Sequence, residues 1–196
     1  MTQLTATATA SQPRRRLTTD EFHRLVESGA LREGSRAFLW DGEMIEPMAE
    51  GPQHINVSEN LREILSDLLP RQAWTVYQDR PLKLRDGFQP QPDLMVLRGP
   101  RSGYRDRLPI PADVAILVEV SGSTYAFDSG EYLQGYARVG IAAYWIVNIA
   151  GRRIEAYSDP DAEGAYRTRQ DYEPGTLVPL EWGAVAVDEV HRLLRP

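Results

Sequence analysis

The sequence predicts one mixed α/β (α+β) domain, and three observations lead to this fold class. Apolar residues recur at helical spacing between Ile55 and Leu69, which predicts an amphipathic helix that ends at Pro70. The uninterrupted apolar run Ala115–Val118 is typical of a central strand that is covered on both faces. Segments after Arg153 read as short antiparallel strands, and 196 residues suffice to bury a single core.

The N-terminal segment differs from the rest of the chain. Residues 1–16 are rich in threonine and alanine, lack apolar periodicity and end in consecutive arginines. We therefore expect a disordered tail, followed by the single domain over residues 17–196. The acid-free, threonine- and arginine-rich composition leaves a transit peptide as the alternative.

Capping residues, turn dipeptides and apolar runs predict the remaining elements in order. Thr18 or Thr19 caps a short helix that begins within Leu17–Phe22, and Asp41-Gly42 is typical of a tight hairpin turn. A second turn is expected at Asp86-Gly87. We further expect strands over residues 37–40, 44–45, 74–84, 93–97, 115–118, 144–148, 153–158, 165–172 and 177–178, helices over 55–69, 128–139 and 187–194, and a long loop over 98–111.

Composition and charge exclude several classes of protein. The chain has no cysteine, which rules out disulfides, thiolate metal sites and a cysteine nucleophile. Its longest apolar stretches, such as Ala142–Ala150, fall far short of the ~20 residues that cross a bilayer, so we expect no membrane association and a cytoplasmic location. The net charge of −6 limits any nucleic-acid partner to local, transient or metal-bridged contacts. Glycine-rich phosphate loops, paired histidine ligands and G-x-S-x-G motifs are missing, so a small-molecule enzyme has no support.

Two carboxylates stand where predicted core strands begin or end. Asp93 opens one strand after Pro92, and Glu119 follows the apolar run Ala115–Val118. Carboxylates at the ends of adjacent strands can converge on one point, and oxygen atoms are the ligands that Mg²⁺ and Mn²⁺ prefer. The alternative is that Asp93 caps a turn and that Glu119 pairs with a nearby arginine.

The two carboxylates belong to a longer sequence pattern. Its most specific parts are Pro92-Asp93, Glu119–Thr124, Asp128 and Tyr136–Val147, and it also includes the opening helix, the Asp-Gly turn and His54. The pattern resembles the Uma-two family of restriction-endonuclease-like proteins, which is part of the PD-(D/E)xK nuclease superfamily. The resemblance extends over nearly the whole predicted domain.

The resemblance implies a restriction-endonuclease-like core, a mixed sheet flanked by helices, that carries a divalent-metal-dependent endonuclease site for DNA. It implies that Asp93 and Glu119 are the metal carboxylates and that the Val120 carbonyl adds a backbone ligand for Mg²⁺ or Mn²⁺. Such an ion polarises the scissile phosphate and lowers the pKa of an attacking water. His54 lines the same cleft, or alternatively bonds to a backbone group at the start of its helix. A homodimer is expected, because a two-fold pair cuts two strands most simply.

The chain departs from the family pattern at its lysine. Superfamily members carry lysine two residues after the second carboxylate, where this chain has Ser121, and relatives carry it four residues after Asp128, where this chain has Tyr132. A tyrosine donates a hydrogen bond but has no positive charge at neutral pH, and losing one such donor costs about 10² to 10³ in rate. Two functions therefore stay open. One is an active endonuclease (a hydrolase) with Tyr132 at its catalytic site; the other is a weakened or inactive nuclease-fold protein that acts as a binding or assembly module.

Basic residues elsewhere are the remaining candidates for positive charge at the site. If the preceding strand turns at Asp86-Gly87, Asp93 faces Arg80, whereas Lys83, the only lysine, points to the opposite face. Arg80 or Arg138 could then reach the site.

The loop that follows the Asp93 strand concentrates positive charge. Arginine side chains in such a loop are suited to contact DNA phosphates, and the alternative is ordinary solvated surface. The residues concerned are Arg98, Arg101, Arg105 and Arg107.

Overall fold

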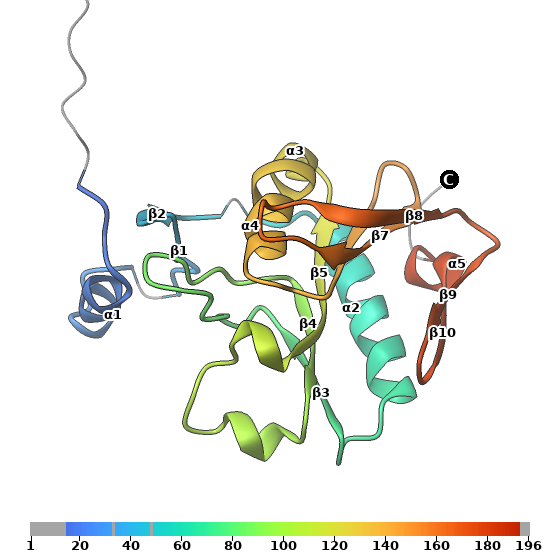
Figure 1. The fold of residues 1–196 in the computed structure, drawn as a ribbon, viewed down its shortest axis with the longest axis horizontal. Helices are drawn as coiled ribbons and strands as arrows, with labels where there is room; N and C mark the ends of the chain where they lie inside the picture. Colours follow the sequence, from blue (N-terminus) through green and yellow to red (C-terminus); the bar gives the residue numbers. More distant parts are fainter. Residues whose placement is uncertain (1–14, 33, 48, 193–196) are drawn as a thin grey trace, which may run out of the picture.

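A six-stranded mixed sheet forms the centre of the computed structural model, which describes residues 15–32, 34–47 and 49–192 (Figure 1). Its strands lie in the order β3-β4-β5-β6-β7-β8; β5 and β6 pair in parallel, and the other neighbours pair antiparallel. This arrangement confirms the predicted mixed α+β class. The strands are β3 (Trp74–Gln78), β4 (Leu94–Arg98), β5 (Val114–Ser121), β6 (Ala143–Asn148), β7 (Arg153–Pro160) and β8 (Tyr166–Tyr172).

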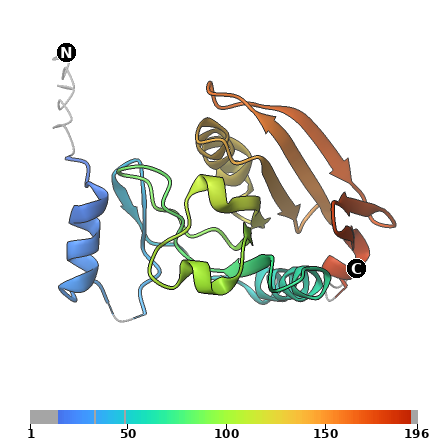
Figure 2. The ribbon, with the colours of Figure 1, turned by 60° about the horizontal axis from the view of Figure 1, so that its bottom comes forward.

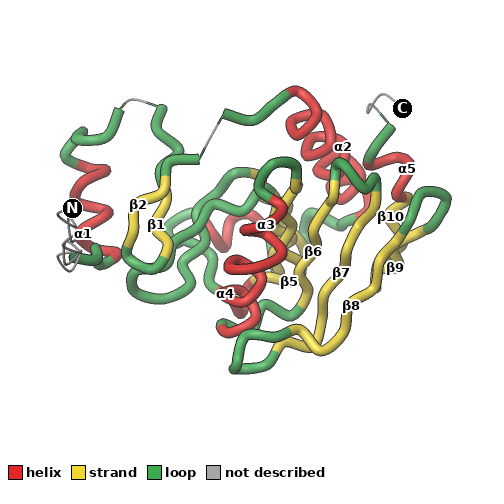
Figure 3. The backbone as a smooth tube through the Cα atoms, turned by 90° about the horizontal axis from the view of Figure 1, so that it is seen from above, coloured by secondary structure: helices red, strands yellow, loops and turns green. Residues whose placement is uncertain are grey.

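Helices cover both faces of this sheet (Figure 3). A continuous helical segment connects the parallel strands β5 and β6, as parallel pairing requires, and it contains a π-helical turn. Because side chains alternate along β5, Val118 and Val120 pack toward α2, whereas Leu117 and Glu119 face the crossover helix. The helices are α2 (Pro52–Leu68) on one face, and α3 (Tyr125–Phe127), the π-turn η3 (Asp128–Tyr132) and α4 (Leu133–Arg138) on the other.

Smaller elements flank the two ends of the sheet (Figure 2). Of the two expected caps, Thr18 is the one observed, and it forms a capping box: its hydroxyl accepts from Glu21 N–H and the Glu21 carboxylate accepts from Thr18 N–H. Gly42 has φ of 71°, and a Cβ there would lie 2.5 Å from the Arg16 Cβ, so the predicted hairpin turn needs glycine. These elements are α1 (Thr19–Glu27), β1 (Phe38–Trp40) and β2 (Glu43–Ile45) at one end, and β9 (Leu177–Leu180), β10 (Gly183–Ala186) and α5 (Val187–Val190) at the other.

The expected strand over residues 74–84 is too long. It ends at Gln78, because Asp79 adopts φ of 51° and Pro81 cannot donate to a ladder. The pairing Gln78↔Leu94 therefore places Asp93 opposite Asp79, whose N–H donates to the Asp93 carbonyl at 3.1 Å. The expectation that Asp93 faces Arg80 is wrong.

Several other boundaries also differ from expectation. β5 continues to Ser121, so the polar residues after the apolar run belong to the strand. The loop after β4 contains the 3-10 turns η1 (Arg101–Tyr104) and η2 (Pro111–Asp113). The expected last residues of the closing helix, 193–194, and most of the expected N-terminal tail lie outside the described residues. Within the described ranges, no helix has the length and apolar character needed to cross a membrane.

Candidate metal site

Asp93 and Glu119 lie side by side at the neighbouring inner strands β4 and β5, where β4 begins, as the sequence predicts. Asp93 directly precedes β4, and the pairing Leu94↔Val118 brings it next to Glu119 on β5. The Asp93 N–H donates to Glu119 Oε2 at 3.3 Å, and the Val120 N–H donates to Asp93 Oδ2 at 2.6 Å. Neither carboxylate forms an ion pair with an arginine in the described part of the chain. The alternative pairing of Glu119 with a nearby arginine is therefore not observed among the described residues.

Glu119 is a buried carboxylate without a cationic partner among the described residues. Its side chain faces the crossover helix, where the Tyr136 hydroxyl donates to Oε1 at 2.8 Å, and the residue is only 7% exposed. Burial, together with the negative charges of Asp93 and Asp128, raises its pKa well above the ordinary value. The fold therefore places an acid where its charged form is disfavoured until positive charge arrives.

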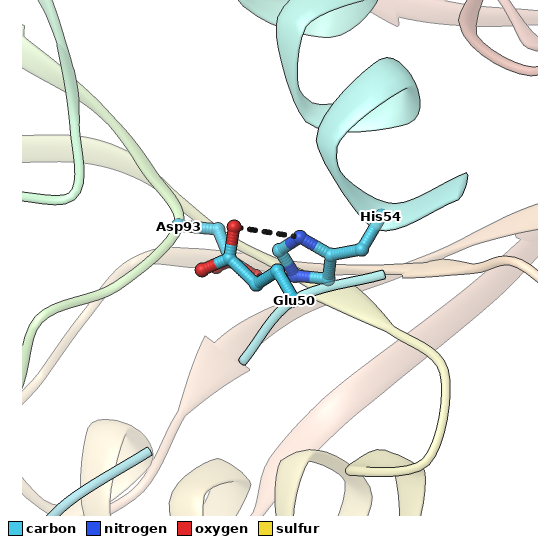
Figure 4. Close-up of side chains that lie close together, drawn as sticks. All are labelled: Glu50, His54 and Asp93. Carbon is cyan, nitrogen blue, oxygen red and sulfur yellow. Dashed lines mark hydrogen bonds and ion pairs between the residues drawn. The ribbon is translucent and has the colours of Figure 1, made fainter. Parts of the chain in front are cut away.

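His54 lies in the first turn of α2 and connects two acids (Figure 4). Its Nε2 lies 3.2 Å from Asp93 Oδ2, and its Nδ1 lies 3.4 Å from Glu50 Oε2. His54 therefore contacts the side chain of Asp93, and not a backbone group at the start of its helix, which was the alternative. Burial lowers the pKa of His54, but the hydrogen bond and charge of Asp93 and the charge of Glu50 outweigh it, and the pKa is raised.

Ligand atoms of Glu50, His54 and Asp93 all lie within 4.8 Å of one another. The buried Nδ1 of His54 has no hydrogen-bond partner within the described structure. An imidazole nitrogen that makes no hydrogen bond and lies beside carboxylate oxygens is the type of donor set that binds divalent cations. The residues present therefore fit such an ion.

Arg36 and Asp79 border this cluster, and neither was predicted. The Arg36 guanidinium pairs with Glu50 and also lies 2.6 Å from Asp79 Oδ1. Burial raises the pKa of Asp79 even though Arg36 opposes the shift. Glu50 itself could have been found from its spacing of four residues before His54, whereas no sequence signal connects Arg36 to either acid.

Asp128 is a further buried acid near the pair, at the start of the π-turn. Its carboxylate accepts from the hydroxyls of Ser121 and Thr124, and its carbonyl accepts from Tyr144 at 2.8 Å. Burial raises its pKa to about 6, although the two hydroxyl donors oppose the shift. Ser121, at the first of the two positions where a lysine was expected, therefore serves to hold Asp128.

Tyr132, at the second of those positions, is largely enclosed by aromatic rings. Its ring centroid lies 4.5 Å from that of Trp40 and 6.3 Å from that of Tyr136. Burial, and then the charges of Glu119 and Asp128, raise its pKa, so the phenol stays neutral at neutral pH. It therefore contributes no positive charge.

The arginines expected near the site divide into separate groups. Arg98 donates to the Val114 carbonyl at 2.7 Å and so braces the start of β5. Arg101, Arg105 and Arg107 line a pocket together with Arg80. Arg138 lines a different hollow beside Trp40, and Lys83 lies in the segment that joins β3 to β4, with its N–H bonded to the Pro109 carbonyl.

Comparisons with known proteins agree with this architecture. A family model described as "Uma2: Putative restriction endonuclease" matches residues 19–184. The chain belongs to the Uma2 family. Its fold is similar to a solved structure described as "a putative nuclease belonging to DUF820 from Anabaena variabilis ATCC 29413", with a TM-score of 0.68, 14% identity, and coverage of 90% of this chain and 98% of that one. Among curated proteins, none matches this Uma2 chain.

Proposed function

We propose that this Uma2 protein is an endonuclease that hydrolyses DNA phosphodiester bonds with the help of Mg²⁺ or Mn²⁺. One observation carries the proposal: Asp93 lies in a cluster with Glu50 and His54, and beside it Glu119 is buried without a cationic partner in the described chain. Carboxylates placed close together lower the stability of the fold unless a cation compensates their negative charge. The nuclease family to which the chain belongs supports the same conclusion.

The side chains have separate roles in this proposal. Asp93, Glu119 and the Val120 carbonyl would hold the ion, with Glu50 and His54 as neighbouring ligands. When bound, a divalent cation supplies positive charge at the scissile phosphate and makes water more acidic.

The surrounding groups position these ligands. Tyr136 fixes one oxygen of Glu119 by donating to it, and the Asp93 N–H fixes the other. Arg36 holds Glu50 at the border of the site. His54, in contact with Asp93, is placed to carry a proton, and Tyr132 could donate a hydrogen bond to a phosphate oxygen.

The second candidate function is a weakened or inactive nuclease fold that serves as a binding or assembly module. The observation that favours it is the neutral, ring-enclosed Tyr132 in place of a lysine. The two functions share a metal site and differ in whether the bound metal supports cleavage.

Isothermal titration with Mn²⁺ tests the metal site. We expect Asp93→Ala and Glu119→Ala to lose most of the binding heat, whereas Asp67→Ala, which removes an acid from another part of α2, binds like the parent. Equal binding by the parent and both site variants would contradict the assignment. A Mn²⁺-dependent plasmid-nicking assay then separates the functions: nicking that disappears in Asp93→Ala supports the endonuclease, and metal binding without nicking supports the module.

The proposal also includes a homodimer and a cytoplasmic location. A two-fold pair brings two metal sites to the two strands of a duplex. Sedimentation equilibrium of the full chain tests the dimer, and a purely monomeric protein that still cuts both strands would contradict it.

A further inference from the structure

A pocket of about 560 Å³ lies between the end of β3 and the loop that carries η1. Arginines and tyrosines dominate its lining, and none of its lining residues is acidic. This is unusual in a chain whose net charge is −6. The residues that matter are Arg80, Arg101, Arg105, Arg107, Tyr77 and Tyr104.

Most of the arginines in this pocket form no ion pair with an acid in the described part of the chain. Arg107 is the exception, because it donates to both oxygens of Asp113, at 2.6 and 2.9 Å. Arg80, Arg101 and Arg105 are exposed, and none of them pairs with an acid in the ranges that the structure describes. Unpaired cations around one hollow raise the local positive potential and attract anions.

Contacts with the sheet hold the pocket in place before any ligand binds. The Tyr104 hydroxyl donates to the Arg98 carbonyl, and the Thr75 hydroxyl donates to the Gly99 carbonyl at 2.9 Å. The Arg101 guanidinium lies over the Tyr77 ring, 5.6 Å from its centroid. A fixed arrangement of this kind reduces the entropy lost on binding.

A short stretch of backbone connects the pocket to the candidate metal site. Arg80 directly follows Asp79, whose N–H donates to the Asp93 carbonyl at 3.1 Å. The metal site itself is acidic and repels phosphate when no cation is bound, so a DNA strand needs positive charge nearby.

We propose that Arg80, Arg101 and Arg105 bind a backbone phosphate of the DNA strand next to the phosphodiester at the metal site. The inference rests on the proposed function and adds a substrate-holding subsite to it. Guanidinium groups suit the task because their fork of N–H donors matches phosphate oxygens. Relative to the sequence expectation, Arg80 is added, whereas Arg98 is left out because its guanidinium is bound to the backbone and Arg107 because it is paired with Asp113.

Fluorescence anisotropy of a labelled duplex, measured in EDTA over a range of salt concentrations, tests the subsite. We expect Arg101→Gln with Arg105→Gln to weaken binding about tenfold at low salt and to reduce the slope of log K against log salt by about 1 to 2. The matched control, Arg24→Gln with Arg167→Gln, removes the same charge from α1 and β8 and should keep the parent slope. Mn²⁺ titration of the pocket variant should match the parent.

If the pocket variant and the control variant weaken DNA binding equally, the effect comes from net charge alone and the subsite is overturned. DNA binding by the pocket variant that equals that of the parent would also overturn it. Loss of Mn²⁺ binding in the pocket variant would also overturn it, because the effect would then arise from the metal site. Micromolar binding of inorganic phosphate that needs Arg101 and Arg105, with unchanged DNA binding, would make it a free-phosphate site instead. If the parent neither binds Mn²⁺ nor nicks DNA while the pocket variant still loses DNA affinity, the endonuclease proposal fails and the subsite stands.

Discussion

Two buried glutamates lie in one row across the sheet, but cationic side chains contact only one of them. The pairings Glu119↔Ile146 and Ile146↔Glu155 align them across β5, β6 and β7, and they are 7% and 0% exposed. Glu155 binds Arg153 at 2.8 Å and Arg169 at 3.2 Å, whereas Glu119 has tyrosine and acids around it. The row therefore contains one carboxylate with its own cations and one without.

The pKa directions follow from these partners. Burial alone would raise the pKa of Glu155, but donors from Asn148, Tyr125 and Arg153 and the charge of Arg169 outweigh it, so its pKa is lowered. For Glu119 the charges of Asp93 and Asp128 add to burial, and its pKa is raised. The comparison indicates that Glu155 is a structural acid and that Glu119 depends on a cation from outside the described chain.

The largest expected effect comes from bringing a cation to Glu119 by substitution. Tyr132 lies near both Glu119 and Asp128, whose charges raise its pKa. If the endonuclease proposal holds, Tyr132→Lys should increase Mn²⁺-dependent nicking on the order of 10²-fold, because it restores a charged donor near the developing negative charge. Tyr132→Met is the control, since it also removes the ring from Trp40 but adds no charge. Equal nicking by the two folded variants would contradict the prediction.

The next effect concerns the acid that has its own cations. Glu155→Gln should lower the free energy of unfolding by about 2 to 3 kcal/mol, because Arg153 and Arg169 lose a buried partner. Urea unfolding monitored by tryptophan fluorescence measures this change. Asp171→Asn is the matched control: Asp171 contacts the same two arginines from the surface, and we expect its loss to cost at most about 1 kcal/mol. A larger loss for Asp171→Asn than for Glu155→Gln would reverse the assignment.

The fold was predictable wherever local chemistry determines the backbone. The cap at Thr18, the glycine at position 42 and the apolar spacing of α2 act over a few residues, and the structure confirms each of them. The end of β3 was missed because a positive φ at a non-glycine residue, Asp79, is imposed by surrounding structure. Pro81 was the available signal that the strand could not reach residue 84.

The candidate site was predictable only in part, for a related reason. Asp93 and Glu119 stand out because each lies where an apolar run begins or ends. The spacing of Glu50 four residues before His54 was an available signal, whereas Arg36 reaches the site through long-range packing that residue type alone does not report. The sequence did not identify Glu155 as the acid with two cations: Arg153 lies two residues before it, but the contact with Arg169 depends on the pairing of β7 with β8.

A smaller effect on stability is expected when the carboxylate of Glu119, which has no cationic partner in the described chain, is removed. In the metal-free protein at pH 7, Glu119→Gln should raise the free energy of unfolding, because burial and the neighbouring acids raise the pKa of Glu119 and disfavour its ionised form in the folded state. Thermal unfolding in EDTA measures the gain. Saturating Mn²⁺ should then stabilise the wild type and leave Glu119→Gln unchanged, because only a protein that binds the ion gains from it. A Glu119→Gln protein that is less stable than the wild type in EDTA would contradict the comparison.

The smallest effect is in how the change in the free energy of unfolding depends on pH, which should differ in sign between Glu119→Gln and Glu155→Gln. The raised pKa of Glu119 destabilises the fold only where the carboxyl ionises, so the gain from Glu119→Gln should vanish below about pH 4 and grow as pH rises. The lowered pKa of Glu155 stabilises the fold above its unfolded-state value, so the loss in Glu155→Gln should be full near pH 7 and fade as pH falls through the folded-state pKa. Urea unfolding of the wild type and both variants at pH 3, 4, 5.5 and 7, in EDTA, gives the two curves. Curves that change in the same direction would show that the protein supplies equivalent compensation to the two acids, and the distinction between a structural carboxylate and a metal-binding one would fail.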